Sequence, residues 1–161
     1  MNMKWKISVL FGALLAVAFV NAEDKAPQAL EQIILFKVQA RPEKWQFSGA
    51  ELKPGEMATI TAEGKWFVVG RSGAGGSGRM PAPDQNYVFP TGYKGCLLVR
   101  IADRPETVRA FRKDDELVPV NVPGRIEFLA NDEDPGSHGG KGYKDNHDFL
   151  TVTIRIIKYG K

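Results

Sequence analysis

The stretch that decides the fold is residues 124–159, GRIEFLANDEDPGSHGGKGYKDNHDFLTVTIRIIKY, in which two strand-like segments flank a long acidic loop. In residues 150–156 every second position is apolar, which is the period of a strand with one buried face. Residues 125–130 alternate in a similar way, with Ile126 and Phe128 on the apolar side. The pattern predicts two strands that hold the joining loop, residues 131–148, in place.

The joining loop concentrates oxygen-bearing side chains, which are Asp132, Glu133, Asp134, Asp145, Asn146 and Asp148. Carboxylate, amide and carbonyl oxygens are the ligands that Ca²⁺ prefers in proteins. The loop is not an EF-hand, because Pro135 occupies a ligand position and Gly136 comes one place early. Two interpretations stay open: a calcium site, or a solvated turn of the kind that Asp, Asn and Gly often form.

Other chemistry has less support in the same region. His138 and His147 flank the acidic cluster, but Zn²⁺ prefers nitrogen and sulfur donors, and the single cysteine, Cys96, lies in a distant predicted strand. Ser137 next to His138 lacks the G-x-S-x-G context of a hydrolase nucleophile. We therefore predict solvated histidines, a buried and inert thiol, and no enzymatic activity.

The first 22 residues are typical of a secretory signal peptide. Lys4 and Lys6 precede an apolar run over residues 7–20, and Ala22 supplies a small residue at the expected cleavage site. The run is too short for a membrane span. We expect an exported protein, periplasmic or secreted, whose mature chain (residues 23–161) has no membrane span.

Charge and length bound the class of the mature chain. The full chain has 22 basic and 19 acidic residues, and without Lys4 and Lys6 the basic count is 22 − 2 = 20, which nearly balances the acidic one. No basic block is interleaved with aromatic residues. Nucleic acid is therefore not an expected partner. The length suits one ordinary core, so we expect a single domain over residues 23–161. One cysteine excludes a disulfide framework.

The rest of the chain predicts further short strands, over residues 33–40, 58–62, 66–69, 95–101, 108–112 and 117–122. Pro54 followed by Gly55 favours a type II turn, and Pro119 favours an edge strand or a bulge. Many short strands without a long helical period predict an all-β, jelly-roll-like sandwich.

The loops at residues 70–91 and 131–148 are where we expect function, because surface loops on a rigid scaffold usually carry it. Residues 73–78 spell G-x-G-x-x-G, the pattern of a dinucleotide-binding turn. Prolines rather than a helix follow, and the flanking segments are strands. We interpret this stretch as a flexible loop and not as a nucleotide site.

Taken in order, these segments resemble the PA-I galactophilic lectins and related bacterial carbohydrate-binding domains over residues 45–156. The matching pieces are LKPGE at 52–56, TITAEGKW at 59–66, PDQ at 83–85, residues 95–101, VPVN at 118–121, Asn131 with Asp132, Asp145 with Asn146, and LTVTI at 150–154. That family consists of small jelly-roll sandwiches, galactose-binding-like in fold, that hold Ca²⁺ and bind galactosides through it. The resemblance implies the same fold, with a galactoside or another glycan with vicinal hydroxyls as ligand.

The resemblance also implies a metal site. Its side-chain ligands would be Asp132, Asp145 and Asn146, and its main-chain ligands Gly142 and Val68 or Val69. Because the loop is longer here than in the family, Asp134 is an alternative to Asp132.

The sugar-binding positions that the resemblance implies are Gln85, Asp132 and Asp145. The family has a histidine three residues before the glutamine, and this chain has Ala82 there. The resemblance therefore implies calcium binding more directly than a choice of galactose.

The sequence thus predicts an exported, non-catalytic, Ca²⁺-dependent carbohydrate-binding protein. A bound Ca²⁺ with open positions accepts vicinal hydroxyls, and the carboxylates around it accept their protons in hydrogen bonds. Single sites of this kind are weak, and a homo-oligomer would raise the avidity. The alternative is a periplasmic or envelope structural protein that keeps the fold, with or without a stabilising calcium ion, and binds no sugar.

Overall fold

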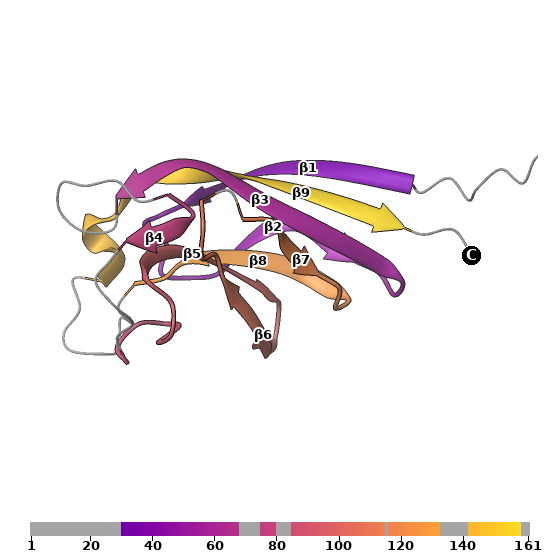
Figure 1. Cartoon of the computed structure of the whole chain (residues 1–161). Helices are drawn as coiled ribbons and strands as arrows, with labels where there is room; N and C mark the ends of the chain where they lie inside the picture. The colour runs from indigo at the N-terminus through magenta and orange to yellow at the C-terminus, as the bar shows by residue number, and fades with distance from the viewer. Residues whose placement is uncertain (1–29, 68–74, 80–84, 115, 133–141, 159–161) are drawn as a thin grey trace, which may run out of the picture.

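The structure, a computed structural model, describes residues 30–67, 75–79, 85–114, 116–132 and 142–158. Within these ranges the chain is almost entirely β, with nine strands, one short 3₁₀ helix and no α-helix. The strands form two antiparallel sheets (Figure 1). The all-β prediction is confirmed. The expected signal peptide, residues 1–22, lies outside the described residues.

The first sheet has four strands in the order β1-β9-β3-β7. Their bounds are β1 Leu30–Gln39, β9 His147–Lys158, β3 Glu56–Phe67 and β7 Val118–Val120. β9 lies between β1 and β3, and Ile154 is paired with Ile34 on one side and Ile60 on the other. The alternation predicted for residues 150–156 is confirmed, because its apolar residues are all buried.

The second sheet is built from β2 Gln46–Leu52, β8 Gly124–Ala130, β5 Lys94–Ile101, β4 Ser77–Arg79 and β6 Arg104–Ala110. β8 lies between β2 and β5. β4 pairs with the first part of β5 and β6 with its later part, so both lie along the edge of this sheet.

The two sheets share one hydrophobic core, consistent with a β-sandwich. The rings of Phe36 on β1 and Phe128 on β8 have centroids 6.3 Å apart. Trp66 at the end of β3 is fully buried, and its indole Nε1 donates a hydrogen bond to the Gly95 carbonyl oxygen at 2.8 Å. Apolar packing and a direct hydrogen bond therefore both join the layers.

Two predictions made from prolines, one of a turn and one of an edge strand, are confirmed. Gly55 has φ +84°, and the Glu56 N–H donates to the Lys53 carbonyl at 3.0 Å, as a type II turn requires. Pro119 lies in β7, which is an edge strand of its sheet.

The predicted elements differ from the structure in three places. Residues 58–62 and 66–67 belong to one continuous strand, β3, because its residues pair with β9 through the polar interruption at residues 63–65. β2 was not predicted. The long loop expected over residues 70–91 contains β4, so its middle is a strand and not a flexible loop.

Candidate functional site

The candidate site lies at the end of the sandwich where β3 ends and β5 and β9 begin, beside the 3₁₀ helix η1 (Gly142–Asp145) (Figure 1). The Tyr143 hydroxyl donates a hydrogen bond to the Ala130 carbonyl oxygen at 2.7 Å. This bond ties η1 to the end of β8, two residues before Asp132. It brings the segments that carry Asp132 and Asn146 to the same end of the molecule.

Asn146 follows η1 and is only 2 % exposed. Its Nδ2 donates a hydrogen bond to the Ala40 carbonyl oxygen at 3.1 Å, and the Ala40 N–H donates to the Asp148 carbonyl at 3.0 Å. The first bond fixes the orientation of the amide. Within the described part of the chain, Asn146 Oδ1 is buried and accepts no hydrogen bond. A buried amide oxygen without a donor is unfavourable unless a ligand or an ion occupies its lone pairs.

Asp132 follows β8 and is fully buried. Its Oδ1 lies 3.1 Å from the ammonium of Lys94, whose side chain is 17 % exposed. The same ammonium lies 5.8 Å from the centroid of the Tyr87 ring. The Asp132 carbonyl oxygen accepts a hydrogen bond from the Val88 N–H at 3.1 Å. A buried carboxylate is stable only with a partner, and no pattern in the sequence predicts that Lys94 is such a partner.

Asn131, next to Asp132, has a different task. It is fully buried, and its Nδ2 donates to the carbonyl oxygens of Phe89 and Tyr93, both at 3.1 Å. Its Oδ1 accepts the Phe89 N–H at 2.9 Å. The side chain therefore holds the segment of residues 89–93 in shape, and no local pattern in the sequence reveals this contact.

For the other predicted site residues, the structure either gives only the element in which they lie or does not describe them. Gly142 and Asp145 belong to η1, and Gln85 is exposed in a turn three residues before Val88. Outside the described residues lie Val68, Val69, Ala82, Asp134, Ser137 and His138.

The residues considered for zinc have separate environments. Cys96 is fully buried in β5, and burial raises the pKa of its thiol to about 12. His147 is exposed, its ring stacks on Phe67 at 4.4 Å between centroids, and its Nδ1 lies 3.0 Å from Asp148 Oδ2. Over the described ranges, no group of three or more His, Cys, Asp or Glu side chains is arranged to hold a metal.

The oxygen donors at this end fit a hard cation in type. Asp132 offers a carboxylate, and Asn146 offers an amide oxygen that lacks a donor within the described residues. Lys94 does not fit a cation site, because its ammonium already contacts Asp132 Oδ1. A cation bound here would share that carboxylate with Lys94 or displace it.

No protein-family model matches the chain, and no curated protein sequence matches it either. The described residues include no helix long and apolar enough to cross a membrane. The class that the fold defines is an all-β protein with two antiparallel sheets.

Proposed function

We propose that the protein is an exported, non-catalytic, Ca²⁺-dependent carbohydrate-binding protein with a lectin-like jelly-roll sandwich. The observation that carries this proposal is the amide oxygen of Asn146. It is buried, has no hydrogen-bond donor within the described part of the chain, and lies at the same end of the sandwich as the buried Asp132. Carboxylate and amide oxygens brought together in this way suit a hard cation.

The residues have the following roles in this proposal. The ion would be held by Asp132, Asn146 and Asp145 and by the main chain of Gly142 and Val69, with Asp134 as the alternative to Asp132. The ion supplies coordination positions for two vicinal hydroxyls of a galactoside or a related glycan. Asp132 and Asp145 would accept hydrogen bonds from those hydroxyls, and the exposed Gln85 would contact the sugar.

The second candidate is an exported structural protein that keeps the fold and binds no sugar. The contact between Lys94 and Asp132 favours it, because the ammonium neutralises the buried carboxylate without a metal. The two candidates differ in what the site does when Ca²⁺ is supplied.

Thermal unfolding of the purified protein in EDTA and in excess Ca²⁺ tests the metal site. An ion that binds only the native state raises the midpoint by mass action. We expect a rise that is lost in Asn146→Ala and Asp145→Ala and kept in Glu106→Ala, an exposed carboxylate on β6. An unchanged midpoint would remove the calcium proposal.

Chromatography on immobilised sugar then distinguishes the two candidate functions. Ca²⁺-dependent retention on immobilised galactose or on a glycan panel, lost in Asn146→Ala, supports the carbohydrate-binding protein. A calcium shift without retention on any glycan supports the structural protein.

A further inference from the structure

A cavity of about 680 Å³ opens at the edge of the sandwich, away from Asn146. Its walls come from β6, β7, the segment of residues 89–93 and the chain that follows β6. β6 and β7 are edge strands of the two sheets, so the cavity lies where the sandwich opens. The volume is within the range of roughly 300–1,000 Å³ that small-molecule sites occupy. We call this cavity the arginine cleft.

Among the described residues, two arginines line the arginine cleft, Arg109 and Arg112. Both side chains are exposed, and within the described residues neither forms an ion pair. Arg109 is paired with Val99 of β5, and Val99 is paired in turn with Phe128, whose ring stacks on Phe36 of the other sheet. Side chains directly opposite each other on neighbouring strands share one face of the sheet. Arg109 therefore leaves β6 on the face that looks toward the other sheet.

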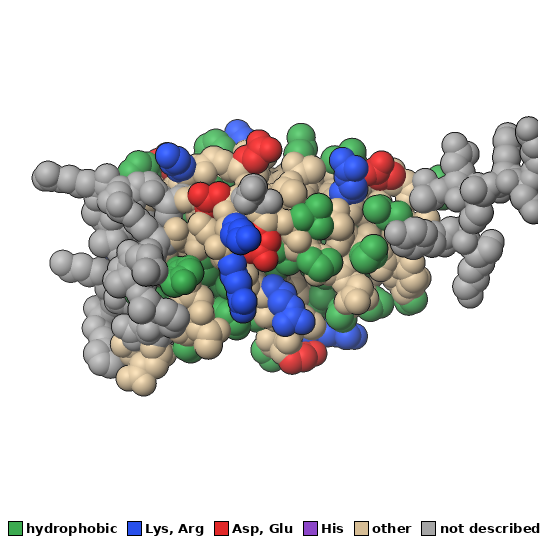
Figure 2. All heavy atoms as spheres, in the orientation of Figure 1, with side chains coloured by type: hydrophobic (Ala, Val, Ile, Leu, Met, Phe, Trp, Pro, Cys, Tyr) green, Lys and Arg blue, Asp and Glu red, His purple; other side chains and the backbone are tan. Residues whose placement is uncertain are grey.

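The described part of the lining also includes one acidic residue, Glu116. Its Oε2 accepts hydrogen bonds from the backbone N–H groups of Arg112 and Lys113, the latter at 3.3 Å. The Glu116 carboxylate is thus already hydrogen-bonded to the backbone of the chain just before it. Among the described lining residues, two arginines and one glutamate leave a single excess positive charge, which matches a monoanionic carboxylate better than a dianionic phosphate monoester. Figure 2 shows basic side chains gathered on the face over β6.

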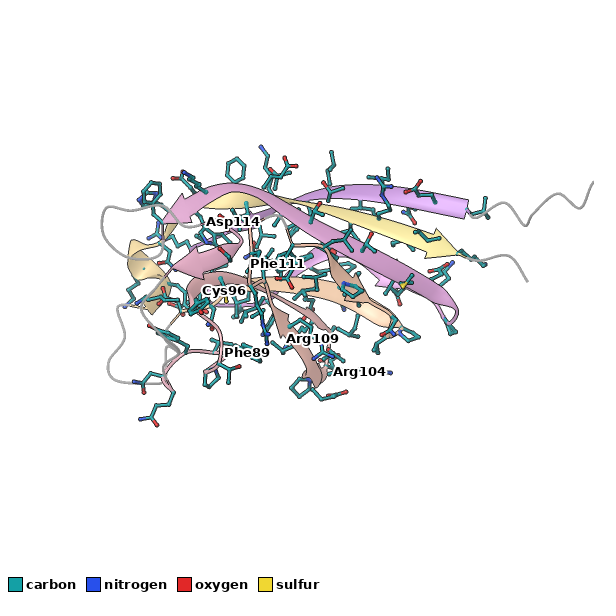
Figure 3. All side chains as sticks on the ribbon, viewed as in Figure 1. Phe89, Cys96, Arg104, Arg109, Phe111 and Asp114 are labelled. Atoms are coloured by element: carbon teal, nitrogen blue, oxygen red, sulfur yellow. The ribbon has the colours of Figure 1, made fainter. Side chains whose placement is uncertain are left out.

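Aromatic rings line the same cleft. Tyr93 is 38 % exposed and Phe89 is partly buried, and Phe111 is almost fully buried. Figure 3 places Phe89 and Arg109 on the same side of the sandwich. The buried amide of Asn131 bonds the backbone of Phe89 and Tyr93, so this wall is fixed before any ligand arrives. A preformed aromatic wall favours a ligand with a flat or apolar face.

We propose that the arginine cleft binds a small organic carboxylate with one apolar face, such as a uronic acid or an aromatic acid. The carboxylate contacts Arg109 and Arg112, and the apolar face packs on Tyr93 and Phe89. Arg is the side chain best suited to this contact, since its planar fork matches a carboxylate with two parallel hydrogen bonds. The proposal is independent of calcium, because Asp132 and Asn146, the predicted metal ligands whose side chains the structure describes, are not among the residues that line the cleft.

The test is a calorimetric or NMR titration of the purified protein in EDTA. The probes are sodium glucuronate and sodium benzoate, and their uncharged matches are methyl glucoside and benzyl alcohol. We expect at least one carboxylate to bind, with its neutral match at least about tenfold weaker, as loss of charge-assisted hydrogen bonds dictates. If glucuronate binds more tightly than benzoate, the ligand is a sugar acid; if benzoate binds more tightly, it is an aromatic acid. Absence of binding by both, or equal binding of the neutral matches, would overturn the proposal.

Variants assign the binding to this cavity. Arg109→Gln and Arg112→Gln are each expected to weaken the carboxylate about tenfold. Arg104→Gln is the matched control, because Arg104 is exposed on the same strand, beside the β5–β6 turn and outside the lining (Figure 3). If Arg104→Gln weakens binding as much as Arg109→Gln, the effect is one of net charge and the proposal fails. Should Arg109→Gln not fold, Arg112→Gln in the chain after β6 decides the question alone.

Discussion

The ammonium of Lys94 lies 3.1 Å from Oδ1 of Asp132, and the carboxylate is completely shielded from solvent. Lys94 begins β5 and Asp132 lies two residues after the end of β8, and β5 and β8 are neighbouring strands of one sheet. In the proposed function the same carboxylate holds a cation. Lys94 and Ca²⁺ are then competitors for Asp132.

The substitution Lys94→Met tests this competition. In EDTA it should lower the free energy of unfolding by about 3 kcal/mol, since it removes the ammonium that lies against a buried carboxylate. In excess Ca²⁺ the loss should be smaller, because the ion replaces the ammonium. Urea unfolding under both conditions measures the difference. Lys158→Met, at the exposed end of β9, should change stability by less than about 0.5 kcal/mol. An equal loss in EDTA and in Ca²⁺ would show that Asp132 is not a metal ligand.

The hydrogen bond from Trp66 to Gly95 joins the two sheets next to Lys94. Trp66→Phe keeps an aromatic ring in the core but leaves the Gly95 carbonyl without its donor. We expect a loss of about 1–3 kcal/mol in the free energy of unfolding, measured by urea denaturation. Trp45→Phe is the control. Trp45 is only partly buried, and its ring contacts the Arg100 guanidinium at 4.2 Å, a contact that phenylalanine retains. Equal losses of stability in the two variants would mean that the smaller ring, and not the missing hydrogen bond, causes the loss.

Strands were predictable wherever their alternation is uninterrupted, as β9 shows. In β3 the alternation stops at residues 63–65, and the sequence predicts two strands there. The structure continues through Gly64, which has φ +102° and is paired with Leu150. Pairing with a neighbouring strand, which no local pattern encodes, decides such a case.

The candidate site was predictable only in part, for the same reason. Asp132 and Asn146 stand out because they flank a loop rich in oxygen donors. Lys94 does not stand out in the sequence, because its contact with Asp132 depends on which strands are neighbours. Arg109 is similar, because an arginine that lines a cleft looks like any other exposed arginine in sequence.

The glycine-rich stretch contains one glycine that the packing requires. Gly78 in β4 has φ +78°, and a Cβ there would overlap the backbone nitrogen of Cys96 and lie 2.8 Å from the Lys94 carbonyl oxygen. Gly78→Ala combines an unfavourable φ with a clash against the backbone of β5. We expect a loss of at least about 2 kcal/mol in the free energy of unfolding.

The matched variant for this prediction is Gly55→Ala. Gly55 has φ +84°, but open space surrounds the position of the added Cβ. It should lose only the conformational contribution, about 1 kcal/mol. Chemical denaturation of both proteins gives the comparison. A loss in Gly78→Ala no greater than that in Gly55→Ala would mean that β4 moves away from β5 easily.

The last prediction concerns pH. The hydroxyl of Ser77 and its backbone N–H, the latter at 3.0 Å, both donate to Asp114 Oδ1, and they hold the pKa of Asp114 below its ordinary value of 3.8. A carboxyl whose pKa is lowered by folding stabilises the protein above its unfolded pKa. That contribution is lost as the pH falls through the lower, folded value. Asp114 is exposed, so solvent screening limits the contribution to less than about 1 kcal/mol.

The wild-type protein should therefore be more stable than Asp114→Asn at neutral pH, and the difference should shrink as the pH is lowered below about 4. Urea unfolding across this pH range measures it. In a Ser77→Ala background, Asp114→Asn should have a smaller effect, because the hydroxyl that lowers the pKa most is gone and only the backbone N–H of residue 77 remains as a donor. A difference that persists in strong acid, or that is unchanged without the Ser77 hydroxyl, would show that Asp114 acts through something other than this pair.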